Sequence, residues 1–205
     1  MKPYDAVAHG ARCSVCPLRG RHQPVGPSGP PAKRAALTLF GEGPGWQEVE
    51  LGIPFVGDSG DYIIRDPERS VLGELGMHPA RVHINNAMSC RAPEKDYGTF
   101  LAKLNARHKR ACDAARKRGE RLPPRPVYPH VACRPRALRE LQGSRVVLAL
   151  GAWAAWCLLG ADKITPIAGY PFKVELRPDG TCVRAWGLGG HEALVDGASG
   201  GRVLR

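Results

Sequence analysis

Residues 1–205 are predicted to form a single α/β domain of three layers, with helices on both faces of a central, mainly parallel sheet of four to five strands. Short apolar runs alternate along the chain with segments of helix-forming residues, which is the pattern of strands joined by helical crossovers. The length of 205 residues suits one domain. Hydrophobic residues make up 43% of the chain, which is enough for a core and too many for wholesale disorder.

Three apolar runs predict the parallel strands of this sheet, at 36–40, 82–86 and 145–150. Helix formers and terminating glycines predict the helices, which pass through 62–64 and span 69–75, 99–118, 134–141 and 152–159. Cys133 is expected to open the helix at 134–141. A Pro-Asp-Gly turn at 178–180 predicts a hairpin between the runs 172–176 and 182–186.

The charge of the chain points to an anionic polymer as its partner. Thirty Lys and Arg against 19 Asp and Glu give a formal net charge of +11, and such an excess favours nucleic acid. Residues 94–128 are predicted to be a basic helical insertion within the domain, because ten Lys and Arg but only three Asp and Glu lie between Lys95 and Arg125. Either this helix is a solvated surface, or it extends a phosphate-binding surface.

The cellular location expected from the sequence is the cytoplasm. No apolar run approaches the length of a membrane span, and residues 1–12 contain no apolar segment typical of a signal peptide. We therefore expect no membrane partner, and a cytoplasmic protein of a bacterium, or of the host cell if a phage encodes it. In that compartment the seven cysteines would stay reduced.

Four of the cysteines are candidate ligands of a metal or a cluster. Cys13 and Cys16 form a C-x-x-C pair, while Cys90 and Cys133 stand at predicted element boundaries, where side chains can reach a shared site. Four thiolates suffice for a tetrahedral zinc ion or for a [4Fe–4S] cluster, and the spacing does not choose between them. Cys112, in the basic helix, is the alternative to Cys133 as fourth ligand if that helix folds back.

The loops that follow the predicted strands carry residues suited to holding a nucleobase at the carboxyl edge of the sheet. Gly41, Glu42 and Gly43 form a glycine-lined turn that lets backbone approach a ligand, and Glu42 could position a water or stabilise positive charge developing on a sugar. Phe55 offers a face on which a base can stack. Asn86 offers an acceptor and a donor, which match the O4 and N3–H edge of uracil and match cytosine poorly.

The order of these motifs resembles the iron–sulfur, family 4-type class of uracil-DNA glycosylases. The matching segments are Cys13-Ser14-Val15-Cys16, Gly41-Glu42-Gly43-Pro44-Gly45, Gly52-Ile53-Pro54-Phe55-Val56-Gly57-Asp58-Ser59-Gly60, Asn86-Ala87-Met88-Ser89-Cys90-Arg91, Ala132-Cys133-Arg134-Pro135 and Leu150-Gly151-Ala152-Trp153-Ala154. Together they cover residues 13–160 apart from the insertion. The resemblance implies a [4Fe–4S] cluster held by Cys13, Cys16, Cys90 and Cys133.

The resemblance also implies roles for the loop residues. Phe55 and Asn86 would hold a uracil flipped out of DNA, and Glu42 would act in the catalytic loop. Glu48 matches an acidic position of the family's E-D pair and joins the predicted catalytic residues, although the neighbouring Asp position is Val49 in this sequence.

The closing H-P-S motif of that class is degenerate in this sequence. His191 stands near its place with no proline or serine after it, so His191 either keeps a catalytic role in a rebuilt loop or the role is lost. The resemblance implies a monomeric DNA-repair enzyme that hydrolyses the N-glycosidic bond of uracil in single- or double-stranded DNA. A second hypothesis stays open, that of a catalytically weak DNA-binding relative acting in phage DNA replication or recognising a modified base.

Overall fold

A parallel three-stranded sheet lies at the centre of the protein, whose computed structural model describes residues 3–66, 69–161, 163–176, 182–187 and 192–193. The strands are β1 (Leu37–Gly41), β2 (Val82–Asn86) and β3 (Val147–Ala149), in the spatial order β2-β1-β3. All three predicted strands are therefore present, and their carboxyl ends meet at one edge of the sheet.

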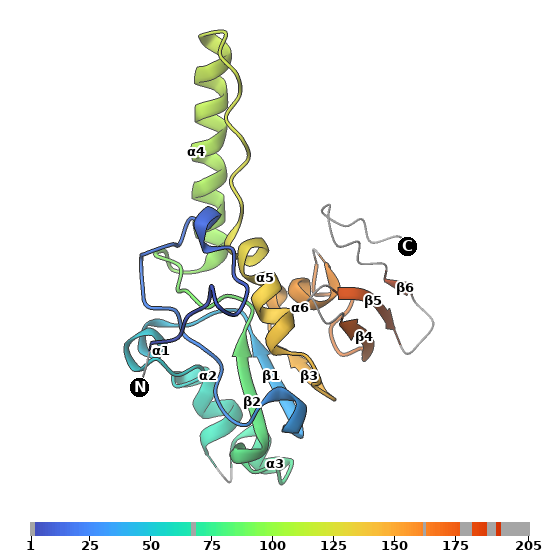
Figure 1. Cartoon of the computed structure of the whole chain (residues 1–205). Helices are drawn as coiled ribbons and strands as arrows, with labels where there is room; N and C mark the ends of the chain where they lie inside the picture. Colours follow the sequence, from blue (N-terminus) through green and yellow to red (C-terminus); the bar gives the residue numbers. More distant parts are fainter. Residues whose placement is uncertain (1–2, 67–68, 162, 177–181, 188–191, 194–205) are drawn as a thin grey trace.

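Helices cover both faces of this sheet, as Figure 1 shows. One face is packed by α5 (Pro129–Glu140) and α6 (Ala152–Leu159). The other is packed by residues of a π-helical turn (Asp61–Arg65), which follows α2 (Asp58–Gly60), and of α3 (Val71–Glu74). The predicted three-layer α/β arrangement is confirmed.

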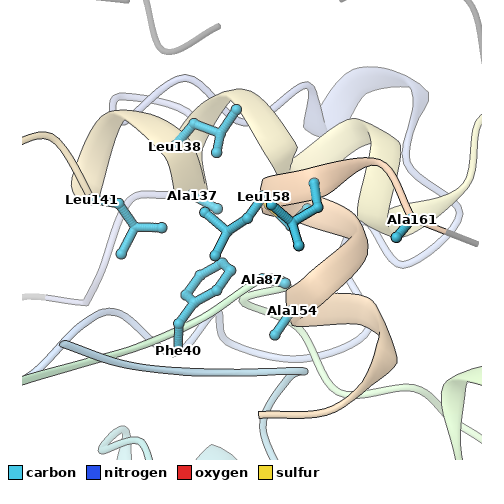
Figure 2. Packing of buried hydrophobic residues seen from close by; sticks show 10 residues of the cluster. Phe40, Ala87, Ala137, Leu138, Leu141, Ala154, Leu158 and Ala161 are labelled. Carbon is cyan, nitrogen blue, oxygen red and sulfur yellow. The ribbon is translucent and has the colours of Figure 1, made fainter. Parts of the chain in front are cut away.

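The two faces of β1 explain this layering, because side chains alternate along a strand. Phe40 points toward α5 and α6 and lies in the cluster that Figure 2 shows, with Ala137, Leu138 and Leu158 around it. Leu39 faces the opposite side and packs in the cluster that contains Ile84, Ile64 and Leu72. Both β1 side chains are fully buried, so β1 is the central strand of the core.

The predicted hairpin is confirmed, but it lies outside the central sheet. β4 (Phe172–Leu176) and β5 (Cys182–Gly187) pair antiparallel, and β6 (Glu192–Ala193) pairs with β5 to complete a second sheet. Within the described residues the central sheet has three strands rather than the four to five expected. The short connection between β4 and β5 suits antiparallel pairing of these two strands with each other. A further parallel strand in the central sheet would need a long crossover.

Two helical boundaries are informative for the site. α4 (Tyr97–Lys117) forms where the basic insertion predicted a helix, and Gly119 follows it with a φ of +67°. α5 begins at Pro129, which suits the first helical turn, so Cys133 lies inside the helix and does not open it as expected. Among the described residues, no helix is both long enough and apolar enough to cross a bilayer.

The remaining helix, α1 (Trp46–Leu51), directly follows the glycine loop of β1. Gly52 ends it in the left-handed conformation, with a φ of +67°. This short helix carries the chain from the first predicted site loop to the second, which contains Phe55.

Candidate functional site

The loops after β1 and β2 are joined at the carboxyl edge of the sheet. Gly41 and Asn86 are register partners in the parallel pairing of the two strands. Beyond that pair, the backbone N–H of Ala87 donates to the Gly41 carbonyl at 2.8 Å, and that of Met88 donates to the Glu42 carbonyl at 3.0 Å. Glu42 and Asn86 are therefore held next to each other, as the strand-end positions predicted.

The side chains of Asn86 and Phe55 converge on Gly41 and pack against it. A Cβ atom on Gly41 would clash with Asn86 Oδ1 and would lie 2.7 Å from Phe55 Cζ. Asn86 is 4% exposed, and no hydrogen bond joins its side-chain amide to another described residue. The edge of the Phe55 ring and the Asn86 amide thus both pack against the Gly41 backbone, which they can approach because residue 41 has no side chain.

Phe55 has a strained backbone, with a φ of +59°, whereas all the other described residues with positive φ are glycines. A bulky residue in this region costs on the order of 1–3 kcal/mol and needs support from its surroundings. One support is Gly60, because a Cβ atom there would clash with the Phe55 carbonyl oxygen. Another is Glu48, whose carboxylate accepts the backbone N–H of Phe55.

The Glu48 carboxylate joins the two site loops. Its Oε2 accepts the backbone N–H of Gly45, at the end of the first loop, and its Oε1 accepts that of Phe55 in the second. Both oxygens of Glu48, which stands in the first turn of α1, are thus engaged with backbone donors. The geometry suits a residue that positions the loops, and the predicted catalytic role of Glu48 stays a prediction.

Glu42 is half-buried at the same edge of the sheet, and its carboxyl titrates near neutrality. Burial raises the pKa of Glu42 to about 7, and the charge of the Asp96 carboxylate adds to the rise. Asp96 itself stays ionised, because hydrogen bonds from the backbone N–H and hydroxyl of Thr99 lower its pKa. A Cβ atom on Gly151 would lie 3.8 Å from Glu42 Oε2, so the end of β3 approaches the same carboxylate.

Tyr97, at the start of α4, packs against the loop that follows β1. A Cβ atom on Gly43 would lie 2.5 Å from the Tyr97 hydroxyl oxygen, so this glycine is needed for the close approach. The hydroxyl donates to the carbonyl oxygen of Cys90. Tyr97 was not among the predicted site residues, although an aromatic residue after a helix-capping Asp96 was a visible signal.

Arg136 forms a buried polar network directly behind Asn86. Its side chain is fully buried, and its guanidinium donates to the carbonyl oxygens of Asn86 and Ala87 and to Asn85 Oδ1 at 3.0 Å. It also pairs with Glu140 Oε2 at 2.5 Å. Arg136 therefore fixes the backbone that carries Asn86, a role that nothing in the basic, helical segment around it indicated.

The four predicted cysteine ligands line one small cavity. Cys13 and Cys16 come from the N-terminal segment, Cys90 from the loop after β2 and Cys133 from α5. Burial raises the pKa of Cys90 to about 12, and the neighbouring cysteines add to the rise. Such thiols stay protonated unless a bound cation stabilises the thiolates.

The donor set of this cavity fits a thiolate-bound metal or cluster. Burial also raises the pKa of Cys16 to about 11, and the proximity of Cys133 and Cys13 adds to the rise. No disulfide joins these cysteines. Within the part of the chain that the structure describes, no group of three or more His, Cys, Asp or Glu side chains stands at metal-ligand spacing, so the four thiols converge without closing on a coordination geometry.

Two other predicted residues have different outcomes. Cys112 lies on α4, with its sulfur 3.5 Å from His108 Nε2, and it does not line the cysteine cavity. The structure therefore brings Cys133, and not Cys112, to the other three cysteines. His191 lies outside the described residues, so its predicted place at the site stays a prediction.

The fold and site define a three-layer α/β protein with Glu42, Phe55 and Asn86 gathered at the carboxyl edge of its parallel sheet and with a cavity lined by four cysteines. No family model matches the chain. The chain is similar to the type-4 uracil-DNA glycosylase of Pyrobaculum aerophilum, with 33% identity over 81 residues. The match covers 40% of this chain and 38% of that protein, so the chain spans about two-fifths of the relative's length. This partial similarity suggests the uracil-DNA glycosylase superfamily.

Proposed function

We propose that the protein is a DNA-repair glycosylase, which hydrolyses the N-glycosidic bond of uracil in DNA. The observation that carries this proposal is the meeting of the Asn86 amide and the Phe55 ring over Gly41, with a carboxyl group of raised pKa beside them. An aromatic ring, an amide and a carboxyl group gathered at one edge of the sheet provide the elements that binding of a flipped base requires.

The pocket residues would recognise uracil through stacking and two hydrogen bonds. Phe55 stacks on the flipped base and restores the stacking that the base gives up when it leaves the duplex. The Asn86 amide donates to O4 and accepts from N3–H, whereas cytosine presents an amino group and an unprotonated nitrogen at these positions. A wrong base leaves the amide unpaired in a largely buried place, which costs about 1–3 kcal/mol.

In the proposed reaction water attacks C1′ while the bond from C1′ to N1 of uracil breaks. The bonding electron pair leaves with uracil, and positive charge develops on the sugar. The ionised Glu42 carboxylate orients the water, accepts its proton and stabilises the sugar charge. Glu48 acts as a positioning residue for the two loops, and His191 is assigned to stabilise the departing uracil anion.

The four cysteines of the cavity are proposed to hold a [4Fe–4S] cluster. Such a group would supply a structural crosslink, because its ligands Cys13, Cys16, Cys90 and Cys133 come from three separate segments of the chain. The partial similarity to a type-4 enzyme supports this proposal over zinc, whereas the four thiols suit either group. Metal and sulfide analysis of the purified protein tests it: iron with acid-labile sulfide is expected, and stoichiometric zinc without iron would overturn it.

The proposed activity is tested by incubating the protein with single- and double-stranded oligonucleotides that contain one uracil. Release of free uracil and formation of an alkali-labile abasic site are expected, and a matched thymine oligonucleotide should stay intact. A folded, metal-loaded protein that releases no uracil would overturn the proposal, and would leave a binding role for the pocket.

A further inference from the structure

α4 forms an arm that leaves the body of the protein at the site itself. Figure 1 shows the helix extending far beyond the sheet, with an extended segment running back beside it. The arm is anchored where Asp96 caps the helix and Tyr97 packs over Gly43. If a nucleic acid bound with one nucleobase at the proposed site, its backbone would lie close to the start of α4.

One face of the arm is used to hold the arm together. Buried or half-buried side chains recur every three or four residues along α4, at Leu101, Leu104, His108, Cys112 and Ala115. The return segment is tied to the helix at both ends. The Glu120 N–H donates to the Ala115 carbonyl at 2.9 Å, and the Tyr128 hydroxyl donates to Asn105 Oδ1 at 2.6 Å. The arm thus consists of a helix and a return segment, and the side of the helix that faces this segment is its inner face.

The outer face of the arm carries three cations that form no ion pair with the described residues. Three of its cations are ion-paired, namely Lys103 with Glu94, Arg116 with Asp113 and Arg118 with Glu120. The exposed side chains of Arg107, Arg110 and Lys117 make no ion pair with any described residue. At about 100° per residue these three project within one third of the helix circumference, opposite the inner face.

We propose that Arg107, Arg110 and Lys117 form a stripe that binds backbone phosphates of duplex DNA flanking the base in the pocket. This inference takes only the DNA partner from the proposed function and does not require base excision. At roughly 1.5 Å rise per residue the stripe spans about 15 Å, and the whole helix spans about 31 Å, close to one turn of duplex DNA. Arginine pairs favourably with phosphate, and no carboxylate among the described residues neutralises this stripe.

The test measures how the dissociation constant depends on salt, with the full-length protein and a 30-base-pair duplex. The stripe variant is R107Q/R110Q/K117Q. The matched control is R34Q/R81Q/R145Q, which removes three exposed arginines just before β1, β2 and β3, at the opposite edge of the sheet. Both variants lower the net charge by the same amount, so they separate a local contact from a general effect of charge.

The stripe variant is expected to flatten the slope of log K against log salt by up to about 2.7, because each duplex phosphate contact contributes roughly 0.9. The control is expected to change the slope by less than about 0.5. The conservative variant R107K/R110K should keep most of the slope. Equal flattening by both triple variants, or no change in either, would overturn the inference.

The same titration with a thymine duplex separates this inference from the proposed activity. The stripe should act equally on uracil and thymine duplexes, because phosphate contacts do not read the base. If the protein releases no uracil but the stripe variant still flattens the slope, the arm's role stands and the proposed reaction falls. Circular dichroism of each variant verifies that α4 is still helical.

Discussion

Gly41 and Asn86 lie opposite each other at the carboxyl ends of β1 and β2, and Asn86 Oδ1 lies so close to Gly41 that a Cβ atom on residue 41 would clash with it. The arrangement of the proposed base-binding residues therefore depends on the missing side chain of Gly41. It also joins two residues that are 45 positions apart in the chain through a single register pair.

Replacing Gly41 by Ala is therefore expected to abolish the pocket and leave the fold in place. The added methyl group would clash with Asn86 Oδ1 and crowd the Phe55 ring, so the amide and the ring must move apart. Uracil release should fall at least 100-fold, as measured by single-turnover kinetics. The control G98A adds a methyl group at the base of α4, where it meets only Asp96 Oδ1 at 3.1 Å, and should keep activity. Equal activity in G41A and wild type would contradict the assigned pocket.

The activity should rise with pH through about 7, because the proposed reaction uses the ionised form of Glu42. The Asp96 carboxylate contributes to the raised pKa of Glu42, so D96N should move the midpoint of the profile to lower pH. Asparagine also caps helices well, so α4 should be retained. The neighbouring Tyr97 stays neutral over this range, because burial raises its pKa. A midpoint that D96N leaves in place would refute the coupling.

Glu42 should also make the stability of the protein depend on pH. Folding raises the pKa of Glu42 from 4.5 to about 7, so the folded state favours the protonated acid. The ionised group costs no stability below pH 4.5, an increasing amount between pH 4.5 and 7, and a constant amount above. E42Q should thus be more stable than wild type at about pH 8 and equally stable at about pH 4. Urea unfolding at both values measures this, and a difference independent of pH would be inconsistent with it.

Removing the buried Arg136 should be strongly destabilising. R136M leaves the Glu140 carboxylate without its close partner and the carbonyl oxygens of Asn86 and Ala87 without their donor. Breaking one partner of a buried pair costs about 3–5 kcal/mol. The double variant R136M/E140M should recover part of this stability. Free energies of unfolding from urea titrations give the comparison, and a decrease below about 1 kcal/mol for R136M would show that the network contributes little.

Local patterns in the sequence were sufficient for the strands, the hairpin and the arm, because alternation, helix formers and glycine stops are read over a few residues. They were also sufficient to place Glu42 and Asn86 at one sheet edge, since parallel strands end together. The number of strands in the central sheet did not follow, because whether a hairpin joins a sheet depends on packing far along the chain. The buried role of Arg136 and the clamp made by Glu48 did not follow either. Both depend on which backbone groups are left without a partner in the folded protein.

The pocket formed by Gly41, Phe55 and Asn86 is proposed to receive a uracil beside Glu42, and the other predictions on activity depend on this. The most direct test is the single-turnover rate of uracil release for wild type, N86A and E42Q on one duplex, with duplex affinity measured in parallel. Wild type is predicted to release uracil, and both variants are predicted to be slower by at least 50-fold while their affinities stay within about threefold, because phosphate contacts dominate binding. Rates that N86A and E42Q share with wild type would contradict the proposed pocket.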